Sequence, residues 1–422
     1  MRLHKISAIF FLLLSMGPPV GWGGNLSAPV SFDSADILPK GVRNLRYNSI
    51  LGGANDKFGP TGSVVGVGDA MNLEVSYQRL IDGQNTEEER GILQGYLERH
   101  DRGMDGIAGK TTGEVNVAVD AQVPILAWGI TDKWTMAMVV PVVTIQTHVD
   151  TGFVASNDLQ KIATQLVGEG KGFKAKEVKQ KTDAAISDKN DKYGYDPLPR
   201  PLTSREQTSL GDIRLINKIQ LAKKTDYTLT FVNELTLPTG RTVDIDQAVD
   251  VATGDGQFDL SLGAVAAYRL SERSSFWSRL GYTWQVSDRV ARRVPQDGDS
   301  SLSPDLDGQV IRDLGNSLYA SVGGSVDIYK GIVLKGQYAF QYKGADEYEG
   351  DKYESYRYDF LGKNTKQRLH SLQLGINYST VSLFRQKKFP LPLDFNLISA
   401  IPLAGENVVK DSSVVAEAAV FF

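Results

Sequence analysis

The chain has 422 residues, a formal net charge of −4 at pH 7 and no cysteine, so it contains no disulfide framework, thiolate metal site or cysteine nucleophile. Charged residues at 23% and aromatic residues at 9% exclude a disordered chain, and the mild negative balance provides no basic patch for nucleic acid. The 42 glycines and 17 tyrosines favour a β-rich chain with many turns.

Residues 1–23 are predicted to be a secretory signal peptide. A short basic region precedes an apolar run from Ile6 to Met16, and small residues follow at Gly21 and Gly23. Beyond that run, no segment approaches the roughly 18 to 20 apolar residues that a membrane-spanning helix needs. We therefore expect an exported chain that does not cross a bilayer as helices.

The first strand has two alternative positions. Residues 70–81 alternate apolar and polar side chains, and this period of two favours them. Residues 41–52 are the alternative. With 70–81 as the first strand, residues 24–68 form an N-terminal segment, either periplasmic or inside the lumen as a plug, and the barrel covers residues 69–422.

The rest of the chain repeats the same alternation in hairpins. Residues 318–328 and 334–343, for example, each place apolar side chains on one face and polar side chains on the other. The further strands predicted in this way cover residues 112–127, 131–147, 209–222, 225–238, 257–270, 274–290, 316–329, 331–344, 367–381, 391–402 and 411–422. With either first strand the prediction is an all-β, antiparallel transmembrane barrel of about 12 strands.

The connections between these strands alternate between short and long. The short ones cover residues 128–130, 223–224, 271–273, 330 and 382–390, and the long ones cover 82–111, 148–208, 239–256, 291–315, 345–366 and 403–410. Outer-membrane barrels have short periplasmic turns and long external loops in this order. Strands of soluble sandwiches average about 5 to 6 residues, whereas these run to about 10 to 17, so the lengths also favour a membrane barrel.

The last strand alternates up to the final residue, Phe422, and resembles the C-terminal signature of Gram-negative outer-membrane barrels. The resemblance implies a place in the cell outer membrane, surrounded by outer-membrane lipids. It also implies insertion by the barrel-assembly machinery, which would recognise this strand.

Charged side chains within the strands are expected to face the lumen, because Arg or Lys at the middle of the lipid face costs about 2 to 4 kcal/mol. The two readings are a lumen closed by ion pairs and a polar track for a small solute. The candidate lumen-facing charges are Asp120, Arg214, Lys218, Glu234, Asp259, Arg279, Asp327, Lys335, Asp394 and Glu417.

Two external connections contain helical patterns. In loop 148–208, apolar residues recur at helical spacing after a cap at Ser156 or Asn157, and a Lys-rich tract and DPLPRPL follow. Residues 87–99 are a second helix candidate. The helix of loop 148–208 is either a lid over the barrel mouth or a surface excursion whose apolar stripe lies on the barrel rim.

No group of residues indicates catalysis, a cofactor or a metal. His370 is followed directly by Ser371, so the His-x-Ser pair of outer-membrane phospholipases is missing. His148 and Asp150 form a spacing expected by chance. Asp305 and Asp307 lack the later bidentate Glu of a calcium loop. We therefore expect that the protein is not an enzyme.

Three short motifs are similar to those of an outer-membrane barrel family associated with meta-pathway phenol degradation. They are WGITDKWTMAMVVPVV at 128–143, LTLPTG at 235–240 followed by GDGQFDLSLG at 254–263, and ILPKG at 37–41. The last match favours 41–52 as the first strand. The resemblance implies a transporter-like barrel, distantly similar to the long-chain fatty-acid and aromatic-hydrocarbon uptake barrels, whose strand count makes about fourteen strands the alternative.

Two functions follow from these observations. The first is passage of a small, aromatic or hydrophobic solute across the outer membrane through a porin-like barrel, with the N-terminal segment or loop 148–208 as the gate. The alternative is a structural or surface-interaction barrel whose lumen is closed and whose long loops contact partners.

Overall fold

The computed structural model describes residues 25–69, 72, 74–82, 87–100, 102–168, 204–245, 250–296, 305–329 and 331–422. The predicted signal peptide and most of loop 148–208, including its Lys-rich tract and DPLPRPL, lie outside these residues. No helix within the described ranges is both long and apolar enough to cross a membrane.

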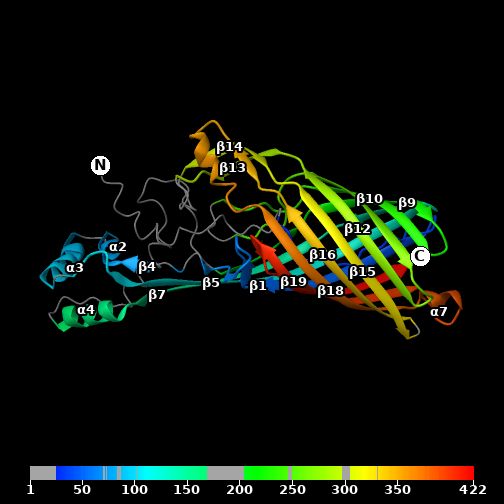
Figure 1. Cartoon of the computed structure of the whole chain (residues 1–422), viewed down its shortest axis with the longest axis horizontal. Coiled ribbons are helices and arrows are strands. Elements are labelled where there is room, and N and C mark those ends of the chain that lie inside the picture. The colour runs from blue at the N-terminus through cyan, green and yellow to red at the C-terminus, as the bar shows by residue number, and fades with distance from the viewer. Residues whose placement is uncertain are drawn as a thin grey trace.

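Twelve antiparallel strands form a closed barrel (Figure 1). The barrel closes because β1 pairs with β21 on one side and with β5 on the other. In chain order the wall strands are β1 (Arg43–Ala54), β5 (Ile107–Thr131), β6 (Trp134–Val139), β9 (Ile213–Lys223), β10 (Tyr227–Leu237), β11 (Asp259–Arg269), β12 (Ser274–Gln285), β15 (Ser317–Tyr329), β16 (Ile332–Lys343), β18 (Gln367–Ser379), β19 (Leu393–Glu406) and β21 (Ser412–Phe421). The predicted fold class and strand number are confirmed.

The wall begins with β1, so the first strand is the alternative predicted at residues 41–52, displaced by two residues. The prediction from period two was wrong: residues 74–82 form the short strand β4 (Glu74–Ser76) and the helix α2 (Tyr77–Asp82). The apolar side chains that suggested a strand, Val75, Tyr77 and Ile81, are buried in a cluster of helices instead. A few alternating residues fit a strand followed by one helical turn equally well.

The outer face of the wall is apolar and the inner face is polar. On β12, Phe276, Leu280 and Trp284 point outward and are 43%, 59% and 43% exposed. Gln337 and Gln373 point inward from β16 and β18 and are 1% and 0% exposed. A water-soluble protein has the opposite distribution, whereas a barrel in lipid has this one.

Aromatic rings mark two levels of the outer face. Tyr268 and Phe276 are paired near one end of the wall, and Trp284 lies eight residues further along β12. At a rise of about 3.3 Å per residue and a tilt of about 40°, the two levels are about 20 Å apart. This spacing agrees with an apolar band flanked by interfacial aromatic girdles.

The connections divide the barrel into two ends. The tight-turn end carries residues 132–133, 224–226, 270–273 and 331 and the connection between β18 and β19, which contains α7 (Val381–Arg385). The long-loop end carries all the other connections, as predicted. Two small sheets stand there, β13 (Asp288–Arg293) with β14 (Leu306–Asp313) and β17 (Glu347–Glu349), next to α6 (Ser355–Asp359), and β20 (Val408–Val409) with β2 (Asp56–Phe58) and β3 (Val64–Gly66).

Two predicted strands are each divided in two. Pro141 ends β6, because proline cannot donate to a strand ladder, and β7 (Val142–Ala155) continues next to the outer half of β5. In the same way, β8 (Arg205–Leu210) is separated from β9, and Gly211 donates its N–H to the Pro141 carbonyl at 2.9 Å. The outer half of β5 with β7 and β8 forms an arm that extends beyond the wall (Figure 1).

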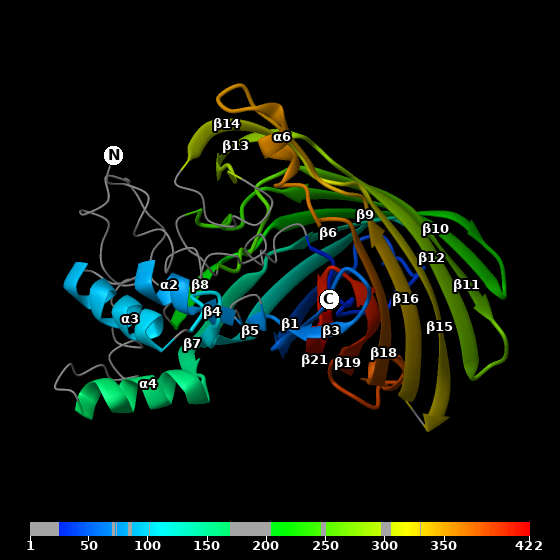
Figure 2. The same cartoon turned by 60° about the vertical axis from the view of Figure 1, so that its left-hand side comes forward.

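Helices α2, α3 (Glu87–Arg99) and α4 (Asn157–Gly168) pack together at the tip of this arm (Figure 2). Leu93 and Leu97 of α3 share one buried cluster with Leu159 and Ile162 of α4. The Ser156 Oγ accepts a hydrogen bond from the Leu159 N–H at 3.1 Å, as expected of an N-cap. The apolar stripe of α4 is therefore covered by other helices, and α4 forms neither a lid nor a rim contact.

Candidate functional site in the barrel lumen

Residues 25–42, the lumen segment, run through the barrel from one end to the other. The Leu26 N–H donates to Gln367 Oε1 at 2.8 Å, where β18 begins at the long-loop end. The Lys40 N–H donates to Asp132 Oδ1 at 3.3 Å in the tight turn between β5 and β6. Gly41, with φ of 82°, then reverses the chain into β1. The positive φ explains the need for glycine at this position.

Asp33 is the main anchor of the lumen segment. Its carboxylate accepts hydrogen bonds from Arg279 Nη1 at 2.9 Å, Tyr319 Oη at 2.7 Å and Ser321 Oγ at 2.6 Å, and the Asp33 side chain is only 7% exposed. Its N–H donates to Gln337 Oε1 at 2.9 Å. Because hydrogen bonds that involve ionised partners are about twice as strong as neutral ones, this anchor fixes the segment at mid-barrel.

Phe32 fills an apolar space next to this anchor. Its ring contacts Trp277 edge to face, with 6.2 Å between centroids, and Lys335 Nζ lies 5.8 Å from the ring centroid. A Cβ on Gly375 would lie 2.7 Å from the ring, and a Cβ on Gly323 would lie 2.5 Å from Trp277. Glycine at these two wall positions therefore makes room for the two rings.

Two further contacts hold the lumen segment to the wall on the tight-turn side of Asp33. Lys218 Nζ donates to the Ser34 carbonyl at 2.7 Å, and Thr230 Oγ1 donates to the Ala35 carbonyl at 2.5 Å. Both donors bind backbone oxygens. The segment forms no strand ladder with the wall, since its partners are mostly side chains.

The charges that were expected in the lumen have different partners. Arg279 binds Asp33, Arg214 pairs with Glu234 at 3.2 Å, and Lys218 and Lys335 contact the lumen segment. Glu417 pairs with Arg46 at 3.2 Å and accepts from Asn396 at 2.5 Å, whereas Asp394 accepts from Asn377 at 2.8 Å. Asp259 and Asp327 lie on the inward faces of β11 and β15 at opposite ends of the lumen.

Asp120 differs from this group, because it lies on the outer face. It pairs in register with Leu51, which is 57% exposed, and accepts a hydrogen bond from Gln122 Nε2 at 2.5 Å. It lies eight residues from Trp128, which is near the tight-turn end of β5, and this separation is about 20 Å along the barrel axis. At this height β5 leaves the apolar band, so a carboxylate on the outer face is solvated.

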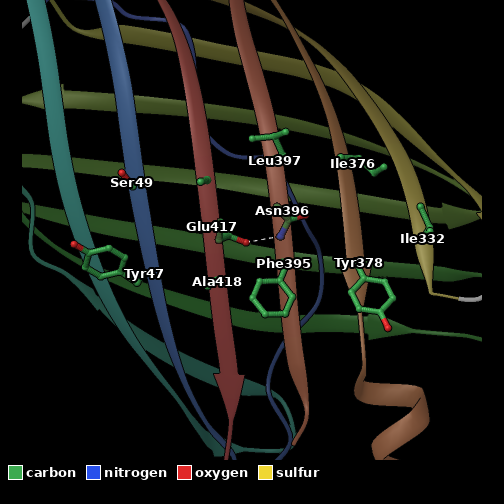
Figure 3. Close-up of a pocket in the computed structure, with 11 residues that line it drawn as sticks. Tyr47, Ser49, Ile332, Ile376, Tyr378, Phe395, Asn396, Leu397, Glu417 and Ala418 are labelled. Atoms are coloured by element: carbon green, nitrogen blue, oxygen red, sulfur yellow. Dashed lines mark hydrogen bonds between the residues drawn. The ribbon is translucent and has the colours of Figure 1, made fainter. Parts of the chain in front are cut away.

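The outer wall carries one notable hollow of about 500 Å³, which Figure 3 shows. Its floor includes Ala416 and Ala418 of β21, and the larger side chains of Tyr47, Phe395 and Tyr378 surround it. The small side chains of β21 create the hollow. It faces the apolar band and is separate from the lumen segment.

Asp411, in the connection that leads to β21, is buried near the end of the lumen segment that lies at the long-loop end of the barrel. Its carboxylate accepts from the Ala28 N–H, but burial raises the pKa of Asp411 to about 7. The folded barrel therefore binds more protons than the unfolded chain between about pH 4 and pH 7. Stability contributed by Asp411 is thus present at low pH and is lost as the pH rises through this window.

Replacing Asp411 by Asn is expected to remove this pH dependence. In urea unfolding, the original chain should lose a few kcal/mol between pH 5 and pH 8 from this group, at roughly 1.4 kcal/mol for each unit of raised pKa. The Asn variant should be more stable than the original chain at pH 8 and show a smaller difference between the two pH values. Equal pH profiles for the two proteins would contradict the assignment.

The histidines form no catalytic group in the described part of the chain. Ser204 Oγ lies 3.0 Å from His148 Nδ1, but it also bonds the Val149 backbone, and no described carboxylate orients the imidazole as a catalytic base requires. His370 points outward and contacts Tyr338 Oη at 2.5 Å. Within the described residues, no three His, Asp or Glu side chains are placed to hold a metal ion.

Several residues of the lumen site were not predicted from the sequence. Phe32 and Asp33 lie in a segment with no periodicity, so nothing in the sequence marks them. Tyr319, Ser321 and Gln337 do share the polar faces of strands whose charged residues, Asp327 and Lys335, were predicted to face inward. A prediction that included the uncharged polar residues of these faces, and not only the charged ones, would have identified all three.

No protein-family model matches the chain, and no curated protein matches it. Among solved structures, an outer-membrane channel from Pseudomonas putida F1 matches with a TM-score of 0.52 and 11% identity, covering 93% of this chain and 100% of that one. The toluene transporter TbuX of Ralstonia pickettii and a FadL homologue of Pseudomonas aeruginosa match with TM-scores of 0.33 and 0.31 and 10% identity each. They cover 91% and 97% of this chain and 90% and 97% of their own. The likeness to the Pseudomonas putida F1 channel shows the barrel fold.

Proposed function

We propose that this protein is an outer-membrane channel for a small solute and that the lumen segment is its gate. The observation that carries the proposal is a polar lumen occupied by the chain's own residues 25–42. Side chains hold this segment, with Asp33 as the main anchor, and no strand ladder does. A wall strand cannot leave without opening the barrel, whereas this segment can move when a few side-chain contacts break.

The location follows from the same proposal. The chain is exported by its signal peptide, residues 1–23, and the barrel-assembly machinery inserts it through the strand that ends at Phe422. Outer-membrane lipids then surround the apolar band. The structural likeness to an outer-membrane channel supports this location. The meta-pathway resemblance and the Phe32 and Trp277 rings in the lumen favour a solute with an aromatic or hydrophobic part.

The test is single-channel conductance in a planar bilayer, with the refolded mature chain and a variant that lacks residues 25–38. Deleting the whole of residues 24–68 is unsuitable, because that range contains β1. The deletion is expected to raise the steady conductance, since it removes the side chains that fill the lumen. Asp36→Ala is the matched control, because it also removes a carboxylate from the segment, and among the described residues this carboxylate hydrogen-bonds only Ser34 and not the wall.

The alternative is a closed barrel that acts as a structural or surface-interaction protein. The observation that favours it is the arm with helices α2, α3 and α4 at its tip, which offers a surface beyond the wall. A folded, heat-modifiable barrel that does not conduct, with or without residues 25–38, would support this alternative and contradict the channel.

A further inference from the structure

We propose that Phe32 and Asp33 occupy a lumen site that binds a small aromatic carboxylate. This inference deepens the proposed function and rests on it, because it names the class of solute that would replace the lumen segment. It starts from the chemistry of the two side chains, an aromatic ring and a carboxylate next to each other, and from the wall residues that contact each of them.

The carboxylate half of the site is complete in the wall. Arg279, Tyr319 and Ser321 supply three donors within 2.9 Å of the Asp33 oxygens, and all three belong to neighbouring strands, β12 and β15. The Arg279 guanidinium also lies over the Tyr319 ring at 5.1 Å. A guanidinium and two hydroxyls are a donor set that suits a carboxylate, whether the carboxylate belongs to Asp33 or to a solute.

Arg279 also has a donor that Asp33 does not use. Its Nε is buried and has no hydrogen-bond partner in the described residues. A free carboxylate can bind a guanidinium through two parallel hydrogen bonds, which Asp33, tethered through its backbone, does not form. The site therefore has more capacity for a carboxylate than the lumen segment fills.

The ring half lies directly beside it. Trp277 supplies an edge-to-face contact, Lys335 places its ammonium near the ring, and Gly375 leaves the space that the ring fills. Trp277 Nε1 donates to Gln337 Oε1 at 2.7 Å, so the indole is fixed. An aromatic ring in this place gains edge-to-face and cation–π contacts that an alkyl chain does not.

Charge favours an anion over a neutral solute. Lys335 and Lys218 contact Phe32 and Ser34, on either side of Asp33 in the sequence, and Arg279 binds Asp33 itself. When the lumen segment leaves, Arg279 loses the carboxylate that it hydrogen-bonds, while Glu234 of the wall stays paired with Arg214. A solute that brings both a ring and a carboxylate restores both sets of contacts.

The test vacates the site and fills it with benzoate. Binding of benzoate to the refolded mature chain in detergent micelles is measured by isothermal titration calorimetry, with a blank titration into micelles. The variants are Phe32→Ala/Asp33→Ala, the same double variant with Arg279→Gln, and Asp36→Ala as the control on the same segment. Acetate and benzyl alcohol are the probes that lack the ring and the charge, and heat modifiability shows that each variant is folded.

The double variant is expected to bind benzoate roughly tenfold or more tightly than the original chain or Asp36→Ala, since each charged hydrogen bond is worth about that factor. Adding Arg279→Gln should remove the gain. Should the double variant fail to fold, Asp33→Asn takes its place, because it keeps the shape and removes the competing charge, and it should also bind benzoate more tightly than the original chain.

Two results would overturn the inference. One is benzoate binding that is equal in the vacated and original chains, and the other is benzyl alcohol binding as tightly as benzoate. Neither result affects the channel, because that proposal is judged by the conductance of the chain without residues 25–38. Conversely, tight benzoate binding in a barrel that never conducts would support the site while contradicting the channel.

Discussion

Replacing Leu280 by Arg is expected to destabilise the folded barrel by about 2 to 4 kcal/mol. Leu280 is 59% exposed on the outer face of β12, between Phe276 near one aromatic level and Trp284 at the other. It therefore lies near the middle of the apolar band, where a guanidinium cannot reach either interface easily. Reversible urea unfolding in phospholipid vesicles measures the difference in free energy.

Leu270→Arg is the matched control, because the substitution is identical and only the depth differs. Leu270 is 64% exposed and directly follows β11 in a tight turn. Near the interface the cost of Arg falls to about 0 to 1 kcal/mol. Equal losses at residues 270 and 280 would show that the exposed apolar face is not the lipid contact.

The wall of the barrel was predictable because its strands have lipid on one face and a polar lumen on the other. Side chains therefore alternate between apolar and polar along each strand. On β15, for example, Val322 and Val326 point to lipid, whereas Tyr319 and Ser321 point to the lumen. The same alternation continues to Phe422, so the strand number and the two barrel ends followed from the sequence. Helix α3 was predicted with its observed bounds, since its apolar residues recur at helical spacing.

The lumen site was not predictable by the same means. The position of Asp33 depends on partners 246 to 304 residues away, Arg279 and Gln337, and no local pattern records such contacts. Asp120 was assigned to the lumen although it lies on the outer face. Alternation shows which side chains share a face of a strand, but it does not show where a long strand leaves the membrane, beyond which the outer face can be polar too. The first strand was misassigned because Val75, Tyr77 and Ile81 also suit a helix.

The charged side chains of the lumen hold the lumen segment and neutralise one another. Arg279 and Lys218 bind the lumen segment, while Arg214 and Glu234 neutralise each other. Under the proposed gate, a closed lumen and a polar track, the two interpretations of these charges, correspond to the same residues with the lumen segment in place and with it removed. Opening by that gate would require Asp33 to exchange Arg279, Tyr319 and Ser321 for another set of donors.

The path of the lumen segment predicts which of its two ends faces the outside of the cell. Because the sequence has no cysteine, labelling of single introduced cysteines can test this topology. The two ends of the segment lie at opposite ends of the barrel: Leu26 contacts Gln367 at the long-loop end, and Lys40 contacts Asp132 at the tight-turn end. With long loops outside the cell, residues near Leu26 face the medium, although they precede the first strand. Ser27 and Lys40 are both exposed and suit single cysteine substitutions.

On intact cells, Ser27→Cys is expected to react with a membrane-impermeant maleimide, and Lys40→Cys is expected to react only after the outer membrane is permeabilised to the reagent. Asp351→Cys in a long loop and Glu272→Cys in a tight turn are the matched controls for the two sides. The expected difference is nearly all or none, because the original chain has no thiol to give a background. Labelling of Lys40→Cys but not Ser27→Cys on intact cells would mean that the barrel is inverted. Labelling of neither would mean that the lumen segment does not reach the outer mouth, and both the gate and the site it occupies would have to be placed elsewhere.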